Sequence, residues 1–233
     1  MEPVLFYGVP LGSSFGSIVA LEWLGQPYRL CRINMPDDMQ NELYDRFNPA
    51  RETPVMLLED GTPLSESVAI LHNLAARDLA KGLGFAQGTR DFDLLNQRLN
   101  FLNTDFYNAF APLWYSFEHD LGSDAKATLD AFGRNQVAKA HGVLETLLKD
   151  REWIMGDRRT IADAYLSGIA RWATFHKAVD TAAYPRIQRL IDKLERDPAV
   201  IFAHAIEEEK TAKSAGGFRG HVTLQSLAAR LAV

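Results

Sequence analysis

The sequence predicts an α/β N-terminal domain followed by an all-α domain, and three observations lead to this fold class. Residues 3–35 read as strand, loop, helix and strand, and residues 51–76 add strand, turn, strand and helix. Residues 82–88 hold three glycines, which is typical of a linker. Beyond them nearly every segment has the apolar spacing of a helix. We therefore expect an α/β domain over residues 1–81, a linker over 82–88 and an all-helical domain over 89–233.

The composition is that of a globular protein without a strongly charged partner. Of the 233 residues, 47% are hydrophobic and 24% are charged, and the net charge is −5. A nucleic-acid-binding domain needs a basic surface, so no nucleic-acid partner is expected. The first residues lack a basic, apolar leader, and no run of about 18 apolar residues occurs. We expect a cytoplasmic protein that does not enter a membrane.

Cysteine and histidine usage excludes several kinds of site. Cys31 is the only cysteine, which excludes an intrachain disulfide, a CxxC redox pair and a cysteine-based zinc site. The six histidines show no metal-ligand spacing such as HExxH. No metal is therefore expected.

The first 35 residues form a predicted βαβ unit. Residues 3–7 are rich in strand formers, residues 9–12 read as a loop, and residues 15–24 read as a helix that ends at Gly25. Residues 28–35 read as a second strand. A strand, a helix and a strand of these lengths predict two parallel strands joined by a right-handed crossover.

Pro54 and the residues after it predict a hairpin. A proline cannot donate to a sheet ladder, so Pro54 can only open the apolar strand 55–58. The bond before a proline is the one peptide bond in which the cis form costs little, about 0.5–1 kcal/mol, so the position is compatible with a cis turn. Residues 59–62 form an acidic-glycine turn that leads into a second strand at 63–64.

A helix is predicted directly after this hairpin. Ser65 stands where an N-cap is expected, and apolar residues at helical spacing follow from Val68 onward. The helix should begin near Glu66, Ser67 and Val68. Its free backbone N–H groups and the positive end of its dipole are suited to holding a carboxylate.

This order of strand, acidic turn, strand and a helix opened by Ser-Glu-Ser resembles the glutathione S-transferase family. The resemblance implies that residues 51–76 are the second half of a thioredoxin-like domain. It implies that Thr53, before a cis Pro54, pairs its backbone with the cysteinyl part of glutathione. It also implies that Glu66 and Ser67 hold the γ-glutamyl carboxylate. An ordinary hairpin packed on a helix is the alternative interpretation of the stretch.

The first loop resembles that of bacterial transferases of the Ser/Cys type, in which Gly12-Ser13-Ser14 aligns with a Gly-Ala-Cys-Ser run. The resemblance puts Ser14 at the serine that donates a hydrogen bond to the glutathione sulfur, and Ser13 at the cysteine that some members use for mixed disulfides. A hydroxyl donor beside a helix N-terminus favours the thiolate, and only the thiolate attacks an electrophile. Ser14 is therefore the predicted catalytic residue, and it is also predicted to bind glutathione.

Two alternatives to this role remain open. Ser13 or Ser14 could simply cap the helix that follows. Tyr7 could activate the thiol instead, since other branches of the family use a tyrosine from the end of this strand. In the alignment of residues 12–14 given above, Tyr7 lies one turn before the position of the residue that activates the thiol.

Two long helices are predicted in the C-terminal part. Apolar residues spaced by three or four extend over 89–117, where Pro112 should kink or end a helix, and residues 124–150 read as another helix. Thr160 and Asp163 form a capping-box arrangement. The run Gly-Asp-x-x-Thr-Ile-Ala-Asp around them resembles the C-terminal domain of the transferases, and so implies the glutathione S-transferase fold for most of the chain.

The first of these helices carries the other predicted site residues. Asn100 and Asp105 match positions that reach glutathione across the dimer interface in the family, so the resemblance implies that both bind glutathione in a homodimer. Tyr107, Phe110 and Trp114 are the candidates for the pocket of an apolar electrophile. Core packing is the other role that such aromatic residues can have.

The resemblance implies a glutathione transferase that uses glutathione as co-substrate and an apolar small molecule as electrophile, without a metal. A non-catalytic regulatory or interaction protein of the same fold is one alternative, since Tyr107-Asn108 replaces a His-Lys pair of the bacterial class. A tyrosine can donate a hydrogen bond but supplies no cation at neutral pH. A glutathione-dependent reductase or isomerase is the other alternative. The retained Thr53-Pro54 and Glu66-Ser67 pairs favour an enzyme that binds glutathione.

No family pattern is visible past Glu209. Residues 214–217 read as a flexible turn. Residues 224–231 read as a short amphipathic helix that packs either on the domain or over the active site.

Overall fold

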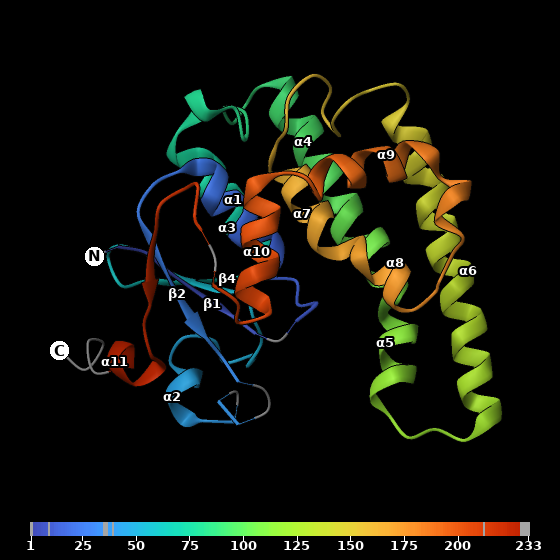
Figure 1. Ribbon diagram of the computed structural model, residues 1–233, viewed down its shortest axis with the longest axis horizontal. Coiled ribbons are helices and arrows are strands. Elements are labelled where there is room, and N and C mark those ends of the chain that lie inside the picture. Colours follow the sequence, from blue (N-terminus) through green and yellow to red (C-terminus); the bar gives the residue numbers. More distant parts are fainter. Residues whose placement is uncertain (1, 9, 35–36, 39, 212, 229–233) are drawn as a thin grey trace.

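A mixed five-stranded sheet forms the centre of the N-terminal half (Figure 1). In spatial order its strands are β4 (Pro63–Ser65), β3 (Val55–Leu57), β1 (Val4–Tyr7), β2 (Tyr28–Arg32) and β5 (Phe218–His221). β1 and β2 are parallel, as the βαβ pattern predicts, whereas β3 runs antiparallel to both β1 and β4. The computed structural model describes residues 2–8, 10–34, 37–38, 40–211 and 213–228.

The two faces of the sheet pack against different helices, because successive residues of a strand point to opposite faces. Leu5 and Met56 pack in one buried cluster with α1 (Phe15–Leu24) and α3 (Ser67–Arg77). Phe6 belongs to a second cluster on the other face, which α2 (Glu42–Asp45) and α11 (Leu224–Ala228) flank. The sheet is therefore covered on both sides.

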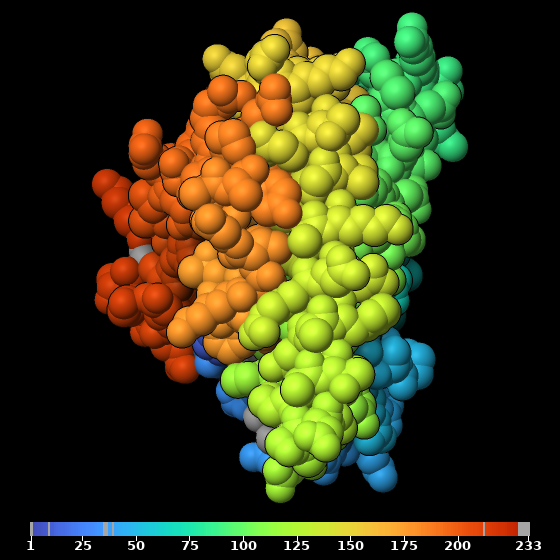
Figure 2. Space-filling model, turned by 90° about the vertical axis from the view of Figure 1, so that its right-hand side faces the viewer, coloured from blue at the N-terminus to red at the C-terminus, as the bar shows by residue number. Residues whose placement is uncertain are grey.

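The C-terminal half consists of helices (Figure 1). The longest is α6 (Ser123–Leu148), and Figure 2 shows it along one face of the molecule with the orange segment that includes α9 (Pro185–Leu194) beside it. The other helical elements are η1 (Leu79–Lys81), α4 (Arg90–Phe101), the π-helical turn η2 (Leu102–Tyr107), η3 (Asn108–Phe110), α5 (Ala111–Glu118), α7 (Ile161–Ile169), α8 (Arg171–Phe175), η4 (Thr181–Ala183) and α10 (Pro198–Glu207).

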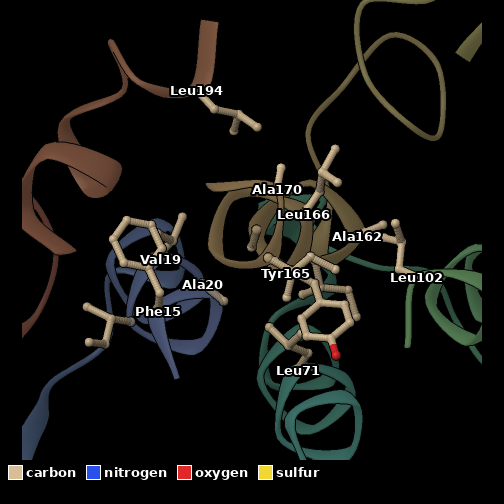
Figure 3. Close-up of a cluster of buried hydrophobic side chains, with 14 of the residues drawn as sticks. Phe15, Val19, Ala20, Leu71, Leu102, Ala162, Tyr165, Leu166, Ala170 and Leu194 are labelled. Atoms are coloured by element: carbon tan, nitrogen blue, oxygen red, sulfur yellow. The ribbon is translucent and has the colours of Figure 1, made fainter. Parts of the chain in front are cut away.

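One hydrophobic core joins the two halves, and α7 lies at its centre. α7 packs against both α1 and α3. In Figure 3, Tyr165 of α7 points toward Leu71 of α3 and Leu166 points to the opposite side of α7, and both side chains are buried. The backbones of α1 and α7 approach closely: a Cβ atom at Gly16 would lie 2.6 Å from the carbonyl oxygen of Ala164. Glycine is therefore required at this crossing.

The predicted capping box at the start of α7 is confirmed. Asp163 Oδ2 accepts hydrogen bonds from the backbone N–H of Thr160 at 2.8 Å and from its hydroxyl at 3.1 Å. Asp163 Oδ1 accepts from the backbone N–H of Ile154 at 2.9 Å. The carboxyl is completely buried, and this burial raises the pKa of Asp163 to about 6. Asp163 thus ties the preceding loop to the central helix.

The helix predicted over residues 89–117 is interrupted in its middle. α4 ends at Phe101, and a π-helical and a 3₁₀ turn precede α5, which has Pro112 in its first turn. The prediction that Pro112 marks a break is thus confirmed, and the missing N–H is harmless at that position. The side chain of Thr104 donates to the carbonyl of Asn100 at 2.9 Å, and that of Asn108 to the carbonyl of Thr104 at 3.2 Å. Such side chains compete for helix carbonyls and favour irregular turns.

The hairpin before α3 is confirmed, but the expected N-cap is wrong. Ser65 is the last residue of β4, and the N-cap position is occupied by Glu66, which makes no side-chain cap hydrogen bond. α3 begins at Ser67. Pairing of Ser65 with Val55 in the sheet takes precedence over its local capping preference.

The C-terminal segment lies with the N-terminal half, contrary to the predicted assignment of residues 89–233 to the helical domain. β5 pairs in parallel with β2, and α11 packs near α2. Residues 214–217 are held in place, because the buried carboxylate of Glu22 accepts hydrogen bonds from the Ser214 hydroxyl at 2.7 Å and from the Gly216 N–H at 2.8 Å. The predicted helix over 224–231 is described as far as residue 228, and its remainder lies outside the described residues.

Candidate active site

A polar cavity of about 230 Å³ lies where the two halves of the molecule meet. The loop before α1, the turn before β3, the start of α3, the η2–η3 region and α7 all contribute to it. Its lining residues are Ser13, Asn48, Glu52, Thr53, Pro54, Glu66, Ser67, Asn103, Tyr107, Asn108 and Tyr165. The structure therefore brings together Thr53, Pro54, Glu66, Ser67 and Tyr107 of the predicted site.

The peptide bond between Thr53 and Pro54 is cis. The turn before it is held by Asn48, whose side-chain N–H donates to the carbonyl of Glu52 at 3.0 Å. Gly8 leaves room for Thr53, since a Cβ atom there would lie 2.8 Å from Thr53 Oγ1. These contacts place the Thr53 backbone at the wall of the cavity.

Glu66 and Ser67 form the wall at the N-terminus of α3. Glu66 has a φ of 71°, in the left-handed region, which costs a residue with a side chain roughly 1–3 kcal/mol. Ser67 is 9% exposed and is the first residue of the helix. The first N–H groups of a helix lack intrahelical acceptors and carry the positive end of its dipole. This wall therefore offers donors for a carboxylate and, in Glu66, a carboxylate for a cation.

The loop before α1 brings Ser13, and not Ser14, to the cavity. Ser13 Oγ donates to the carbonyl of Thr53 over a long 3.4 Å. Ser14 is the N-cap residue of α1, is 2% exposed and makes no side-chain cap hydrogen bond. Ser14 was the residue predicted to face the sulfur, and the cavity lining favours the alternative, Ser13.

Tyr7, the third candidate for activating the thiol, lies outside this cavity. Its hydroxyl is hydrogen-bonded to His221 Nε2 at 3.0 Å, and both residues line a different cavity of about 470 Å³ together with Arg32. Burial raises the pKa of Tyr7, so its phenol is protonated at neutral pH. The position of Tyr7 does not support a role at the glutathione sulfur.

The π-helical turn η2 contributes polar side chains to the cavity wall opposite the hairpin. Tyr107 and Asn103 both belong to this turn, and Tyr165 of α7 donates its hydroxyl hydrogen to Asn103 Oδ1 at 2.7 Å. Burial raises the pKa values of Tyr107 and Tyr165. Both phenols are thus neutral hydrogen-bond donors at physiological pH.

The aromatic residues predicted for an electrophile pocket surround Trp172, which the prediction missed. The ring centroids of Tyr107, Phe110 and Trp114 lie 5.0, 5.6 and 5.4 Å from that of Trp172, all edge to face. Phe110 is completely buried and acts as core. Trp114 also stacks on Phe175, which is 40% exposed. An aromatic cluster of Tyr107, Trp114, Trp172 and Phe175 therefore borders the polar cavity through Tyr107.

Asn100 and Asp105 lie outside the polar cavity. Both are exposed, and Asp105 lines a separate groove of about 240 Å³ that Phe132 and Val143 of α6 also line. Phe132 is 53% exposed and Val143 is 40% exposed. Asn100 and Asp105 therefore do not line the polar cavity of their own chain, and their predicted contact with the glutathione of a partner subunit stays a prediction.

Five lining residues were not predicted. Sequence signals existed for three of them: Asn103 and Asn108 lie in the same polar stretch as the predicted residues Asp105 and Tyr107, and Tyr165 is a polar-tipped side chain in the mostly apolar helix α7. No local pattern distinguishes Asn48 or Glu52, which reach the cavity only because the chain turns before the cis proline.

Cys31 is buried and does not line the polar cavity. Burial raises the pKa of Cys31 to about 12, so this thiol is unreactive. Among the residues that the structure describes, no group of three or more His, Cys, Asp or Glu side chains is placed to hold a metal ion. In the same part of the chain, no helix is long and apolar enough to cross a bilayer.

Known proteins show the same pattern of sequence and fold. Residues 14–77 match the family model of the glutathione S-transferase N-terminal domain, and residues 107–198 match that of the C-terminal domain. Glutathione S-transferase GstA of Escherichia coli O157:H7 is 34% identical over 171 residues, which are 72% of this chain and 81% of the relative. Glutathione S-transferase GST-4.5 of Xanthomonas campestris pv. campestris is 30% identical over 202 residues, 83% of this chain and 94% of the relative.

The fold is shared with a solved sphingomonad glutathione S-transferase in complex with glutathione. That structure superimposes with a TM-score of 0.77 at 28% identity, and the match covers 88% of this chain and 98% of the other. The family's N-terminal match includes the cis-proline turn and the start of α3, which wall the polar cavity. The chain therefore belongs to the glutathione S-transferase family.

Proposed function

We propose that the protein is a glutathione transferase that joins the sulfur of glutathione to an apolar electrophile. The observation that carries this proposal is the meeting of Thr53, cis Pro54, Glu66 and Ser67 in one polar cavity beside an aromatic cluster. Relatives that are named glutathione S-transferases support the same activity. Glutathione is the thiol that keeps the cytosol reduced, so we also propose that the protein acts in the cytoplasm.

Glutathione binding follows from the chemistry of the cavity wall. The hydroxyl of Ser67 and the free N–H groups of α3 receive the γ-glutamyl carboxylate, and the Glu66 carboxylate pairs with the neighbouring ammonium group. The backbone of Thr53, in the wall of the cavity, pairs with the backbone of the cysteinyl residue. This arrangement points the thiol of glutathione toward the loop that carries Ser13.

The reaction requires glutathione as the thiolate. The thiol gives up its proton to water, the sulfur lone pair forms a bond to the electrophilic carbon, and the leaving group departs with its bonding electrons. Ser13 assists by donating a hydrogen bond to the thiolate, and the N-terminus of α1 adds its dipole. A hydrogen bond to a charged group contributes about 1.5–3 kcal/mol, enough to lower a thiol pKa by about one to two units.

Conjugation to an aryl halide activated by nitro groups tests this function. Wild-type protein should show a glutathione-dependent rate, and Ser13→Ala should raise the pKa of the bound thiol by about one unit or more. Its rate at neutral pH should fall by about tenfold, because a smaller fraction of the bound glutathione is thiolate. The thiolate absorbance of bound glutathione is measured against pH, together with initial rates.

Ser14→Ala is the matched control, since Ser14 makes no side-chain cap hydrogen bond that its loss would remove. It should leave the thiol pKa and the rate nearly unchanged. A larger pKa shift in Ser14→Ala than in Ser13→Ala would assign the sulfur contact to Ser14. Absence of glutathione binding at millimolar concentration would contradict the transferase proposal as a whole and favour a non-catalytic protein of the same fold.

The electrophile is proposed to be apolar because of the cluster around Trp172. Trp172 is itself held by a hydrogen bond from its indole N–H to the carbonyl of Leu11 at 2.8 Å, in the loop before α1. Trp114 offers a partly exposed aromatic face beside Trp172, and Phe175, which stacks on Trp114, offers another. Flat apolar molecules stack on such rings.

We also propose that the protein is a two-fold homodimer that uses the surface around Phe132. This ring and Val143 are exposed apolar side chains on α6, next to Asp105 and Phe101. An isologous contact would bury this surface and bring Asn100 and Asp105 near the partner subunit. In such a dimer these two residues would reach the glutathione of the partner subunit, whereas neither of them lines the polar cavity of its own chain.

Phe132→Asp is expected to raise the dissociation constant of the dimer by at least about tenfold, because a carboxylate would be buried in an apolar contact. Sedimentation equilibrium measures it. Phe117→Asp is the matched control, since Phe117 is 61% exposed but packs near Trp114 on α5. A dimer equally weakened by both substitutions, or a wild-type protein that is monomeric at micromolar concentration, would contradict this interface.

A further inference from the structure

The C-terminal helix α11 lies outside both ranges that the family models match, residues 14–77 and 107–198. It packs against α2 of the N-terminal half, and Figure 1 shows the two short helices next to each other. Among the described residues that line the polar cavity, none belongs to α11. The transferase proposal therefore does not use this helix directly.

The contact between α11 and α2 is apolar. Leu224 and Leu227 are three residues apart, so they share one face of α11, and they are 3% and 0% exposed. Both belong to the buried cluster that contains Tyr44, Phe47 and Phe6. α2 has only four residues, and a helix this short is not stable without tertiary packing. Leu224 and Leu227 supply part of the packing that holds it.

α2 in turn holds the turn before the cis proline. The hydroxyl of Tyr44 donates to the carbonyl of Glu52 at 2.7 Å. Arg51 donates to both carboxylate oxygens of Asp45, at 2.6 and 2.7 Å. Arg51 has a φ of 56°, a conformation that a residue with a side chain adopts only when its surroundings enforce it. The shape of this turn thus depends on its contacts with α2.

This turn carries three of the residues that line the polar cavity: Asn48, Glu52 and Thr53. The backbone N–H of Asn48 donates to the carbonyl of Tyr44 at 3.0 Å, directly after α2. A continuous series of contacts therefore leads from Leu227 through Tyr44 to this wall of the cavity.

We propose that α11 is a positioning element for glutathione binding: Leu224 and Leu227 hold α2, and α2 holds the turn 48–53 where glutathione binds. This inference rests on the proposed function. Ser13, which contacts the sulfur in that proposal, lies on another element, so α11 sets the fraction of molecules ready to bind and not the chemistry of the bound thiol. A site that is formed in only a fraction of the molecules has a dissociation constant raised by the inverse of that fraction.

Leu227→Ala is expected to raise the dissociation constant for glutathione by about five- to twentyfold, because the truncated side chain leaves α2 partly unsupported. The KM for glutathione should rise with it, whereas kcat at saturating glutathione should stay within about twofold, since bound glutathione restores the turn. Calorimetry and rates of conjugation to the nitro-activated aryl halide measure these values. Leu227→Met keeps the side-chain volume and should restore wild-type affinity.

Leu144→Ala is the matched control. Leu144 lies on α6, is 1% exposed and belongs to the other buried cluster, so the substitution removes the same atoms from an equally buried site. It should lower the free energy of unfolding, measured by chemical denaturation, but leave the glutathione dissociation constant within about twofold. A general loss of stability is thereby separated from a loss of position at the turn.

Tyr44→Phe tests the next contact in the series without removing apolar packing. The variant loses the hydrogen bond to Glu52, and we expect the glutathione dissociation constant to rise by at least about threefold, with kcat unchanged. In the double variant Leu227→Ala/Tyr44→Phe the increase should be smaller than the product of the two single increases, because both substitutions act on the same turn.

Hydrogen–deuterium exchange without glutathione tests the structural step alone. The backbone N–H groups of Phe47, Asn48 and Arg51 donate to carbonyls within the segment 44–51. Their exchange should be faster in Leu227→Ala than in the wild-type protein and unchanged in Leu144→Ala, because only the first variant loosens α2.

Unchanged exchange over residues 44–51 in Leu227→Ala would overturn the proposal. Wild-type glutathione affinity in both Leu227→Ala and Tyr44→Phe would also overturn it, as would equal weakening by Leu144→Ala. Absence of glutathione binding in the wild-type protein would contradict the transferase proposal instead. The exchange experiment would still show whether α11 holds α2, so the two failures are distinguishable.

Discussion

Replacing Asp163 by asparagine is expected to lower the free energy of unfolding by about 2–4 kcal/mol. Asp163 accepts three hydrogen bonds in a completely buried site, two of them from the backbone N–H groups of Ile154 and Thr160. An asparagine offers one acceptor oxygen and turns an NH₂ group toward the remaining donors. A buried N–H left without an acceptor costs about 1–3 kcal/mol. Chemical denaturation followed by circular dichroism measures the difference.

The control for this substitution is Asp180→Asn. Asp180 caps the short helix η4 by accepting from the N–H of Ala182 at 3.1 Å, but at an exposed position. Asparagine is as good an N-cap residue as aspartate, so Asp180→Asn should lower the free energy of unfolding by less than about 1 kcal/mol. If both variants lost the same free energy of unfolding, burial of the Asp163 carboxylate would not be the cause of its effect on stability.

The effect at Asp163 should also depend on pH in a defined direction. Burial raises the pKa of Asp163 to about 6 in the folded protein, against about 3.9 for an unfolded aspartate. The folded state therefore holds the proton more tightly, so this group's stabilising contribution is full below about pH 4 and is lost as the pH rises through about 6. The asparagine side chain does not titrate, so the variant lacks this pH-dependent contribution to stability. The stability difference between wild type and Asp163→Asn should thus widen as the pH falls from 7 to 4, and a narrowing would contradict the assignment.

Ser67→Ala is expected to weaken glutathione binding by about 10- to 100-fold. If Ser67 and the N-terminus of α3 hold the γ-glutamyl carboxylate, the lost contact is a hydrogen bond to a charged group, worth about 1.5–3 kcal/mol. Glu66→Gln should cause a loss of similar size, because the variant keeps the shape of the side chain but not the charge that pairs with the ammonium group. Calorimetric titration with glutathione measures both affinities.

Ser65→Ala provides the matched control for Ser67→Ala. Ser65 lies two residues earlier, in β4, and does not line the polar cavity. Its loss should change glutathione affinity by less than about twofold. If Ser65→Ala weakened binding as much as Ser67→Ala, the effect would come from the hairpin as a whole, and the direct contact of Ser67 with glutathione would be refuted.

The elements that the sequence predicted well are those whose causes lie within a few residues. The capping box needs only Thr160 and Asp163, three positions apart, and the structure contains it. The hairpin before α3 needs a turn between two short apolar strands, and it is present. Pro112 lacks an N–H wherever it stands, so a break in the helix beside it was predictable. Recognition of the family rested on these local motifs, and the comparisons confirm it.

The composition of the candidate site was only partly predictable. Thr53, Pro54, Glu66 and Ser67 meet because one hairpin and one helix carry all four. Asn103 and Tyr165 come from helices far along the chain, and they reach the cavity only through the packing of α7 against α1 and η2. The spacing of apolar residues within either helix does not predict this packing, because it depends on segments far away in the sequence.

By itself, the sequence determined the order of the elements, the family and the cis-proline wall of the site, because propensity, capping and turn chemistry act over short distances. The tertiary structure decided which serine of the adjacent pair Ser13-Ser14 faces the cavity, since this depends on how the loop before α1 packs against Thr53. It also decided the place of β5, whose four residues Phe-Arg-Gly-His have no strong strand pattern. That strand exists because Glu22 anchors residues 214–216 and the edge of β2 lies open beside them, and both conditions arise only once the chain has folded.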